Sequence, residues 1–155
     1  MEIALSVLKY KRNESKAEYL NTANQIYIET LRFLTRLSNR YSRLVSGNVI
    51  QLAAEVLNHV EKANSIYPSD DERKKLRKAH LLEARASLMA LDVHLTHCYE
   101  LISLNPEGCF ETANGKPVKQ SDAKQKINNM AESLGCLIDK ENTMITNLLK
   151  SDKKR

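Results

Sequence analysis

The most constraining feature of this chain is residues 70–104, where apolar side chains recur at helical spacing on two neighbouring faces. Ser69-Asp70-Asp71-Glu72 predicts a capped start, because acidic groups satisfy and stabilise the first turn of a helix. A helix with so wide an apolar surface must be covered by other helices or by neighbouring subunits. One row is Leu81, Ala84, Leu88, Leu91, Leu95, Cys98 and Ile102, and the second is Leu76, Ala79, Leu82, Ala86, Met89 and Val93.

Three further segments show helical periodicity. They are predicted to cover about 14–37, 41–67 and 122–150, with Ser121 as the cap of the last one. Short connections force antiparallel neighbours. The sequence therefore predicts an all-α, antiparallel up-down-up-down four-helix bundle with a long loop between helices three and four.

The rest of the chain adds little structure to this bundle. Asn114-Gly115 within the long loop suits a small hairpin, although a plain ordered loop is expected for so short a segment. A single domain is expected over residues 1–155, with a basic N-terminal arm at 1–13 and a frayed basic tail at 151–155.

Composition limits the compartment and the partners. The net charge is +5, from 24 basic and 19 acidic residues, which permits a polyanion partner without requiring one. The three cysteines, Cys98, Cys109 and Cys136, have no paired spacing and point to a reducing compartment. No apolar run approaches the roughly 20 residues that span a bilayer. We therefore expect a cytoplasmic protein without a membrane partner.

The residues that carry chemistry in other proteins do not assemble into an active site here. His94 and His97 share one helix face, but a bundle metal site needs Glu-x-x-His motifs, and Leu91 stands three residues before His94. Glu55 and His59 lie four residues apart and keep a metal-dependent enzyme open as a third interpretation. Cys109 is expected to be the more exposed thiol. We expect no catalytic residues, no metal and no cofactor, with the histidines near the core or a subunit seam.

Basic residues cluster in two places. The first cluster spans the turn between the first two helices, and the second crowds the first turns of the third helix. Such runs are usually solvated faces that pair with nearby acids, so this alternative stays open. The candidate nucleic-acid contacts are Arg32, Arg36, Arg40, Arg43, Arg73, Lys74, Arg77 and Arg85.

Several segments resemble one bacterial four-helix-bundle family, and the resemblance covers essentially the whole chain. The family includes proteins encoded in intervening sequences of 23S ribosomal RNA genes and the accessory variability determinant of diversity-generating retroelements. The segments are Ser6-Val7-Leu8-Lys9, Glu14-Ser15-Lys16-Ala17, Tyr41-Ser42-Arg43-Leu44, Glu61-Lys62-Ala63-Asn64-Ser65-Ile66 and His80-Leu81-Leu82-Glu83-Ala84.

The resemblance implies a non-enzymatic accessory protein. Its accessory variability branch implies a homopentameric basic barrel that binds the reverse transcriptase and its template RNA or cDNA and supports mutagenic retrohoming. The surplus apolar surface of residues 70–104 independently favours a homo-oligomer. The alternative is a structural or protein-interaction bundle of the ribosomal intervening-sequence type, without a nucleic-acid role.

Overall fold

The fold was described from a computed structural model, which covers residues 17–104, 106, 108–112 and 114–154. These residues form four α-helices, and the predicted all-α four-helix bundle is confirmed at that level. The arm predicted at 1–13 lies outside the described residues. The helices are α1 (Glu18–Arg36), α2 (Asn39–Asn64), α3 (Asp71–Leu104) and α4 (Gln120–Lys153).

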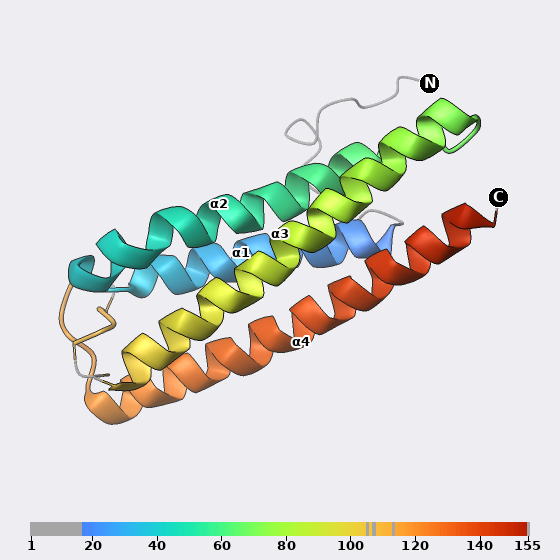
Figure 1. Ribbon diagram of the computed structural model, residues 1–155. Helices are drawn as coiled ribbons and strands as arrows, with labels where there is room; N and C mark the ends of the chain where they lie inside the picture. The colour runs from blue at the N-terminus through green and yellow to red at the C-terminus, as the bar shows by residue number, and fades with distance from the viewer. Residues whose placement is uncertain (1–16, 105, 107, 113, 155) are drawn as a thin grey trace, which may run out of the picture.

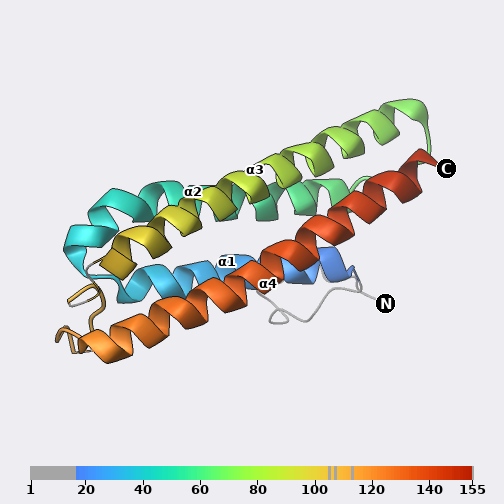
Figure 2. The same ribbon diagram turned by 60° about the horizontal axis from the view of Figure 1, so that its bottom comes forward.

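The helices pack side by side along a common direction. Each packs against two others: α1 and α3 both contact α2 and α4. The α1/α2 turn and the segment joining α3 to α4 lie at one end of the bundle, and the α2/α3 turn lies at the other (Figure 1). The second view places the end of α4 at the same end as the start of α3 (Figure 2).

The two apolar rows of α3 have different surroundings. Every member of the row from Leu81 to Ile102 is buried among the other helices. The second row is exposed, with Leu76 and Val93 each 52% accessible to solvent. The chain's own helices therefore cover only one of the two apolar surfaces.

Helix ends follow the sequence in part. The backbone N–H of Arg73 donates to Asp70 Oδ1 at 2.9 Å, as the acidic start of α3 predicts. The predicted cap of α4 is wrong, because that helix begins at Gln120 and Ser121 lies inside its first turn. Lys119 occupies the cap position in an extended conformation, without a side-chain cap bond. The last helix continues to Lys153, beyond its predicted end at about residue 150.

The segment between α3 and α4 is a loop anchored to the end of α1. The Ser38 N–H donates to the Cys109 carbonyl at 2.7 Å, and the Glu111 N–H donates to the Arg36 carbonyl at 2.8 Å. Gly115 has a φ of 77°, which suits glycine. The described residues contain isolated bridges and no strand. Cys109 is fully buried, so the expectation that it is exposed is wrong: Gly108 turns the loop back onto the bundle.

None of the helices in the described part of the chain is long and apolar enough to span a membrane.

Candidate nucleic-acid interface

A basic groove lies between the start of α3 and the end of α4. Its volume is about 570 Å³, and we call it the α3–α4 groove. Six of its lining residues are basic and two are acidic, so cationic groups dominate its walls. The lining residues are Asp71, Lys74, Lys75, Lys78, Leu82, Arg85, Thr146, Leu149, Lys150, Asp152 and Lys153.

Helical periodicity places these cations on one side of α3. Lys74, Lys78 and Arg85 are four and seven residues apart, which keeps them on one face. The last turn of α4 supplies Lys150 and Lys153 from across the groove. A cleft lined by one sign of charge raises the local potential and attracts ligands of the opposite sign. The arrangement is therefore suited to an anionic ligand with several charges.

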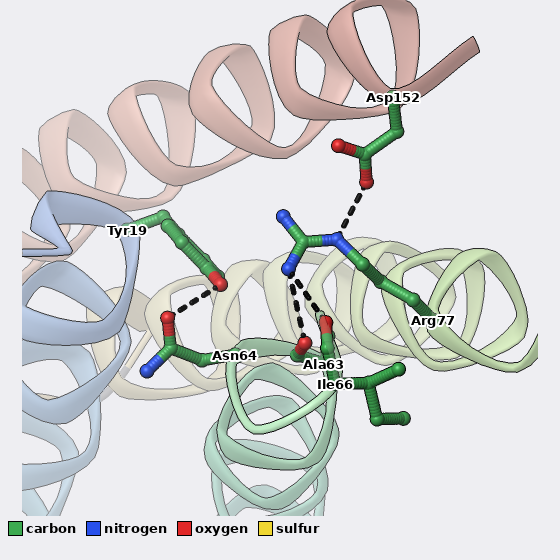
Figure 3. Close-up of polar contacts among 6 residues, drawn as sticks. All are labelled: Tyr19, Ala63, Asn64, Ile66, Arg77 and Asp152. Carbon is green, nitrogen blue, oxygen red and sulfur yellow. Dashed lines mark hydrogen bonds and ion pairs between the residues drawn. The ribbon is translucent and has the colours of Figure 1, made fainter. Parts of the chain in front are cut away.

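Arg77 belongs to a buried clamp beside this groove (Figure 3). Its Nε donates to Asp152 Oδ2 at 2.6 Å, and its Nη1 donates to the carbonyls of Ala63 at 3.2 Å and Ile66 at 3.1 Å. The last carbonyls of a helix lack intrahelical partners, so Arg77 satisfies the end of α2 while it holds the end of α4. Arg77 is only 8% exposed and was expected on a basic surface. We correct that expectation: its position in the structure is internal.

Tyr19 completes this polar cluster from α1. Its hydroxyl donates to Asn64 Oδ1 at 3.0 Å (Figure 3). Burial raises the pKa of Tyr19, and the nearby positive charge of Arg77 partly opposes that rise. Side chains from all four helices thus meet near the clamp.

The other predicted contacts fall into separate places. Lys74 and Arg85 line the α3–α4 groove. Arg73 is exposed at the start of α3 and pairs with Asp70. Arg40 and Arg43 are exposed at the start of α2. There the Arg40 guanidinium lies 4.8 Å from the centroid of the Tyr41 ring.

Arg32 and Arg36 line a second hollow, between α1 and α4, with a volume of about 260 Å³. Lys126 adds a cation from α4, and Phe33 and Phe110 form part of an apolar wall. Arg32 also pairs with Glu29 at 3.0 Å, an exposed contact of little energetic weight. We call this the α1–α4 hollow. The structure therefore divides the eight predicted residues among several surfaces and the core.

The histidines and cysteines form no evident reactive centre. The His94 and His97 rings lie 6.3 Å apart, centroid to centroid. Among the described residues, no group of three or more potential ligands is placed to hold a metal ion. Burial raises the pKa of the Cys98 thiol to about 11, so it behaves as a small apolar group.

A pair of histidines, His59 of α2 and His80 of α3, lie in contact although no local sequence pattern predicts this. His59 Nδ1 and His80 Nδ1 are 3.1 Å apart, a distance at which one nitrogen donates to the other. Burial lowers the pKa of His80, and the positive charges of His59 and Lys62 lower it further, whereas Glu83 opposes the change. Burial of the ring between α2 and α3 therefore favours the neutral form of His80.

Glu141 is the most unusual buried group in the described residues. It is fully buried on α4, and neither carboxylate oxygen has a hydrogen-bond partner there. Burial raises its pKa from 4.5 to about 8, with Lys140 opposing the change. The spacing of Ile138, Glu141 and Ile145 on the apolar row was the available sequence signal.

Sequence reasoning also missed most of the α4 side of the interface. Lys75 and Lys78 belong to a recognised basic run but not to the predicted contacts, although both line the groove. Lys126, Lys150 and Lys153 reach the two hollows only because α4 packs beside α1 and α3.

Comparison of the chain with family models, with curated proteins and with solved structures finds no match. The resemblance to the retroelement accessory family therefore stays a prediction.

Proposed function

We propose that this protein is an up-down-up-down four-helix bundle that acts as a non-enzymatic, cytoplasmic accessory protein of a diversity-generating retroelement. It holds template RNA or cDNA beside the reverse transcriptase. The α3–α4 groove is the observation that carries the nucleic-acid part of this proposal. The reverse transcriptase and the retroelement enter through the family resemblance alone.

The groove supports polyanion binding through both charge and shape. Lysine and arginine at its walls neutralise phosphates, and the release of counterions then supplies most of the affinity. Leu82 and Leu149 supply apolar surface in the same groove. The chemistry favours a flexible chain of phosphates over a single small anion, because the cations come from two helices and several turns.

A salt titration of RNA binding tests this proposal. We expect the logarithm of the association constant to fall linearly with the logarithm of salt concentration. The double variant Lys75→Gln, Lys78→Gln should bind more weakly, and the slope should become shallower by roughly 0.7 for each phosphate that is no longer neutralised. The double variant Lys116→Gln, Lys124→Gln removes the same charge outside the groove and serves as the control. Equal weakening in both variants, or no binding at low salt, would overturn the nucleic-acid role.

The partner is tested separately. The purified protein should co-elute with a reverse transcriptase encoded beside its gene, and paired template and variable repeats should lie nearby. The double variant Lys75→Gln, Lys78→Gln should keep this association if the enzyme binds elsewhere on the bundle. A gene neighbourhood without a reverse transcriptase would remove the retroelement from the proposal.

The exposed apolar row of α3 favours a second candidate function, a structural or protein-interaction bundle. Leu82 is 39%, Met89 40% and Val93 52% exposed. A contiguous apolar surface of this kind marks a protein contact more often than a solvated face. Within the leading proposal the same row joins copies of the chain into a homo-oligomer, and the resemblance gives a pentamer. Assembly without RNA binding would favour the second candidate.

A further inference from the structure

The outer side of α4 carries a row of exposed residues that contains no carboxylate. The row begins at Lys126, ends at Lys150 and keeps the alternating spacing of three and four residues that follows one face of a helix. We call it the α4 row. Between its two ends lie Asn129, Ser133, Cys136, Lys140, Thr143 and Asn147.

This row connects the two basic hollows. Lys126, Asn129 and Ser133 line the α1–α4 hollow, and Lys150 lines the α3–α4 groove. Lys150 lies 24 positions after Lys126, which corresponds to roughly 36 Å of helix at about 1.5 Å per residue. α4 runs without interruption over this distance (Figures 1 and 2). The row therefore begins at one hollow and ends at the other.

Acidic groups border the row without entering it. Glu132 and Asp139 are exposed on the neighbouring row of α4. Within the α4 row, Lys140 pairs with Glu18 of α1 at 2.9 Å. Both side chains are more than half exposed, and such a pair contributes little and opens readily. Glu29 lines the α1–α4 hollow, and Asp71 and Asp152 line the α3–α4 groove, but basic residues outnumber the acidic ones in both hollows.

We propose that the α4 row and the two hollows form one binding path for single-stranded RNA, an inference that rests on the proposed function. Lysine ammonium groups and the side chains of serine, threonine and asparagine all donate to phosphate oxygens. In the α1–α4 hollow, Phe33 and Met130 add apolar wall beside Arg36 and Lys126, which suits an unpaired base with its phosphate. A strand with splayed bases can use both features.

A duplex fits the same surface differently. The backbone of a B-form DNA duplex returns to one side about every 34–36 Å, which is close to the roughly 36 Å of helix between Lys126 and Lys150. A duplex would therefore contact the two ends and leave the middle of the α4 row untouched. Thr143 lies in that middle part, so a negative charge placed there distinguishes the two ligands.

The test measures binding of single-stranded RNA of about 4 and about 16 nucleotides, lengths at the two ends of ordinary single-strand site sizes. Only the longer RNA can reach both hollows. We expect Arg36→Gln with Lys126→Gln to weaken binding of the longer RNA and to reduce its salt slope by about 0.7 for each phosphate that is no longer neutralised. The same variant should leave binding of the shorter RNA unchanged, because that RNA occupies the more strongly basic groove.

Thr143→Glu should weaken binding of the longer single strand, and Asn58→Glu, which adds the same charge on α2, should not. Circular dichroism and thermal unfolding must match the parent protein for every variant. Groove-dependent RNA binding that does not change with RNA length, with the Arg36→Gln, Lys126→Gln double variant or with Thr143→Glu would overturn the path and leave the proposed function standing. Duplex binding that is tighter than single-strand binding and insensitive to Thr143→Glu would also overturn it. Absence of all RNA binding at low salt would remove the proposed function itself.

Discussion

Replacing Glu141 by glutamine should make the protein more stable at neutral pH. Glu141 is fully buried without a hydrogen-bond partner in the described residues, and burial raises its pKa from 4.5 to about 8. The folded protein therefore keeps the proton near pH 7, whereas the unfolded chain releases it. Folding at pH 7 must therefore take up a proton from solution, which costs free energy. Glutamine has nearly the same shape and requires no proton.

The expected magnitude follows from the two pKa values. Because the folded pKa is raised, the stability contribution is fully present below about pH 4.5 and is lost as the pH rises toward about 8. At pH 7 the pH lies well above the unfolded pKa of 4.5 but still below the folded pKa. The difference between pH 7 and the unfolded pKa corresponds to a loss of about 3 kcal/mol of unfolding free energy, at 1.36 kcal/mol for each pH unit. The amide and the protonated carboxyl group leave similar polar atoms buried, so that cost nearly cancels in the comparison.

Urea denaturation followed by circular dichroism measures this effect. The difference in unfolding free energy between Glu141→Gln and the parent protein should grow from near zero at about pH 4.5 to about 3 kcal/mol at about pH 7. The control Glu132→Gln changes an exposed carboxylate of the same helix and should stay within about 0.5 kcal/mol. A difference that does not vary with pH, or a Glu141→Gln variant that is less stable at pH 7 and above, would refute the reasoning.

Three other outcomes are expected. Because burial lowers the pKa of His80, the stability it contributes should be present above about pH 6.5 and be lost as the pH falls below that value; His80→Gln should flatten this part of a urea-denaturation profile. Arg77→Met should cost about 3 kcal/mol of unfolding free energy in urea denaturation, because it leaves a largely buried carboxylate unpaired, and a change below about 1 kcal/mol would contradict this role. Met89→Glu with Val93→Glu should convert an oligomer to the 17.7 kDa monomer in light scattering; a parent protein that is already monomeric would refute the association surface.

The helices were largely predictable because their apolar period is local. The row from Leu81 to Ile102 recurs every three or four residues, and the structure buries all of it. The errors fall at helix ends and in the loop. Ser121 has the side chain of a cap, but the helix already begins one residue earlier, at Gln120, and the extended Lys119 occupies the cap position. The burial of Cys109 depends on how the loop packs on the end of α1, which no local period records.

The interface was predictable only on its α3 side. Lys74 and Arg85 share a helix face, so spacing alone placed them together. Lys150 and Lys153 complete the groove from a segment more than sixty residues away, and only the packing of α4 on α3 brings them there. The α4 row has regular helical spacing, but it could be recognised only after the structure showed which face of α4 is exposed.

Arg77 and Glu141 share one lesson about charged residues on apolar rows. Arg77 precedes Leu81 by four residues and Ala84 by seven, which places it on the buried row of α3. Its membership of a basic run concealed that position. A charged residue in register with a core row is therefore expected inside, where its partners decide whether it stabilises the fold or costs stability.

The clamp and the groove have opposite effects at the end of the bundle that holds the α2/α3 turn. Lysines of α3 face lysines of α4 across the groove, and their repulsion favours separation of the two helices. The ion pair between Arg77 and Asp152 acts in the other direction, because it ties the last turn of α4 to α3. A polyanion in the groove would replace the repulsion by attraction to both helices. Ligand binding and the contact between α3 and α4 at this end therefore favour each other. A bound polyanion stabilises the bundle at the place where repulsion between its lysines destabilises it.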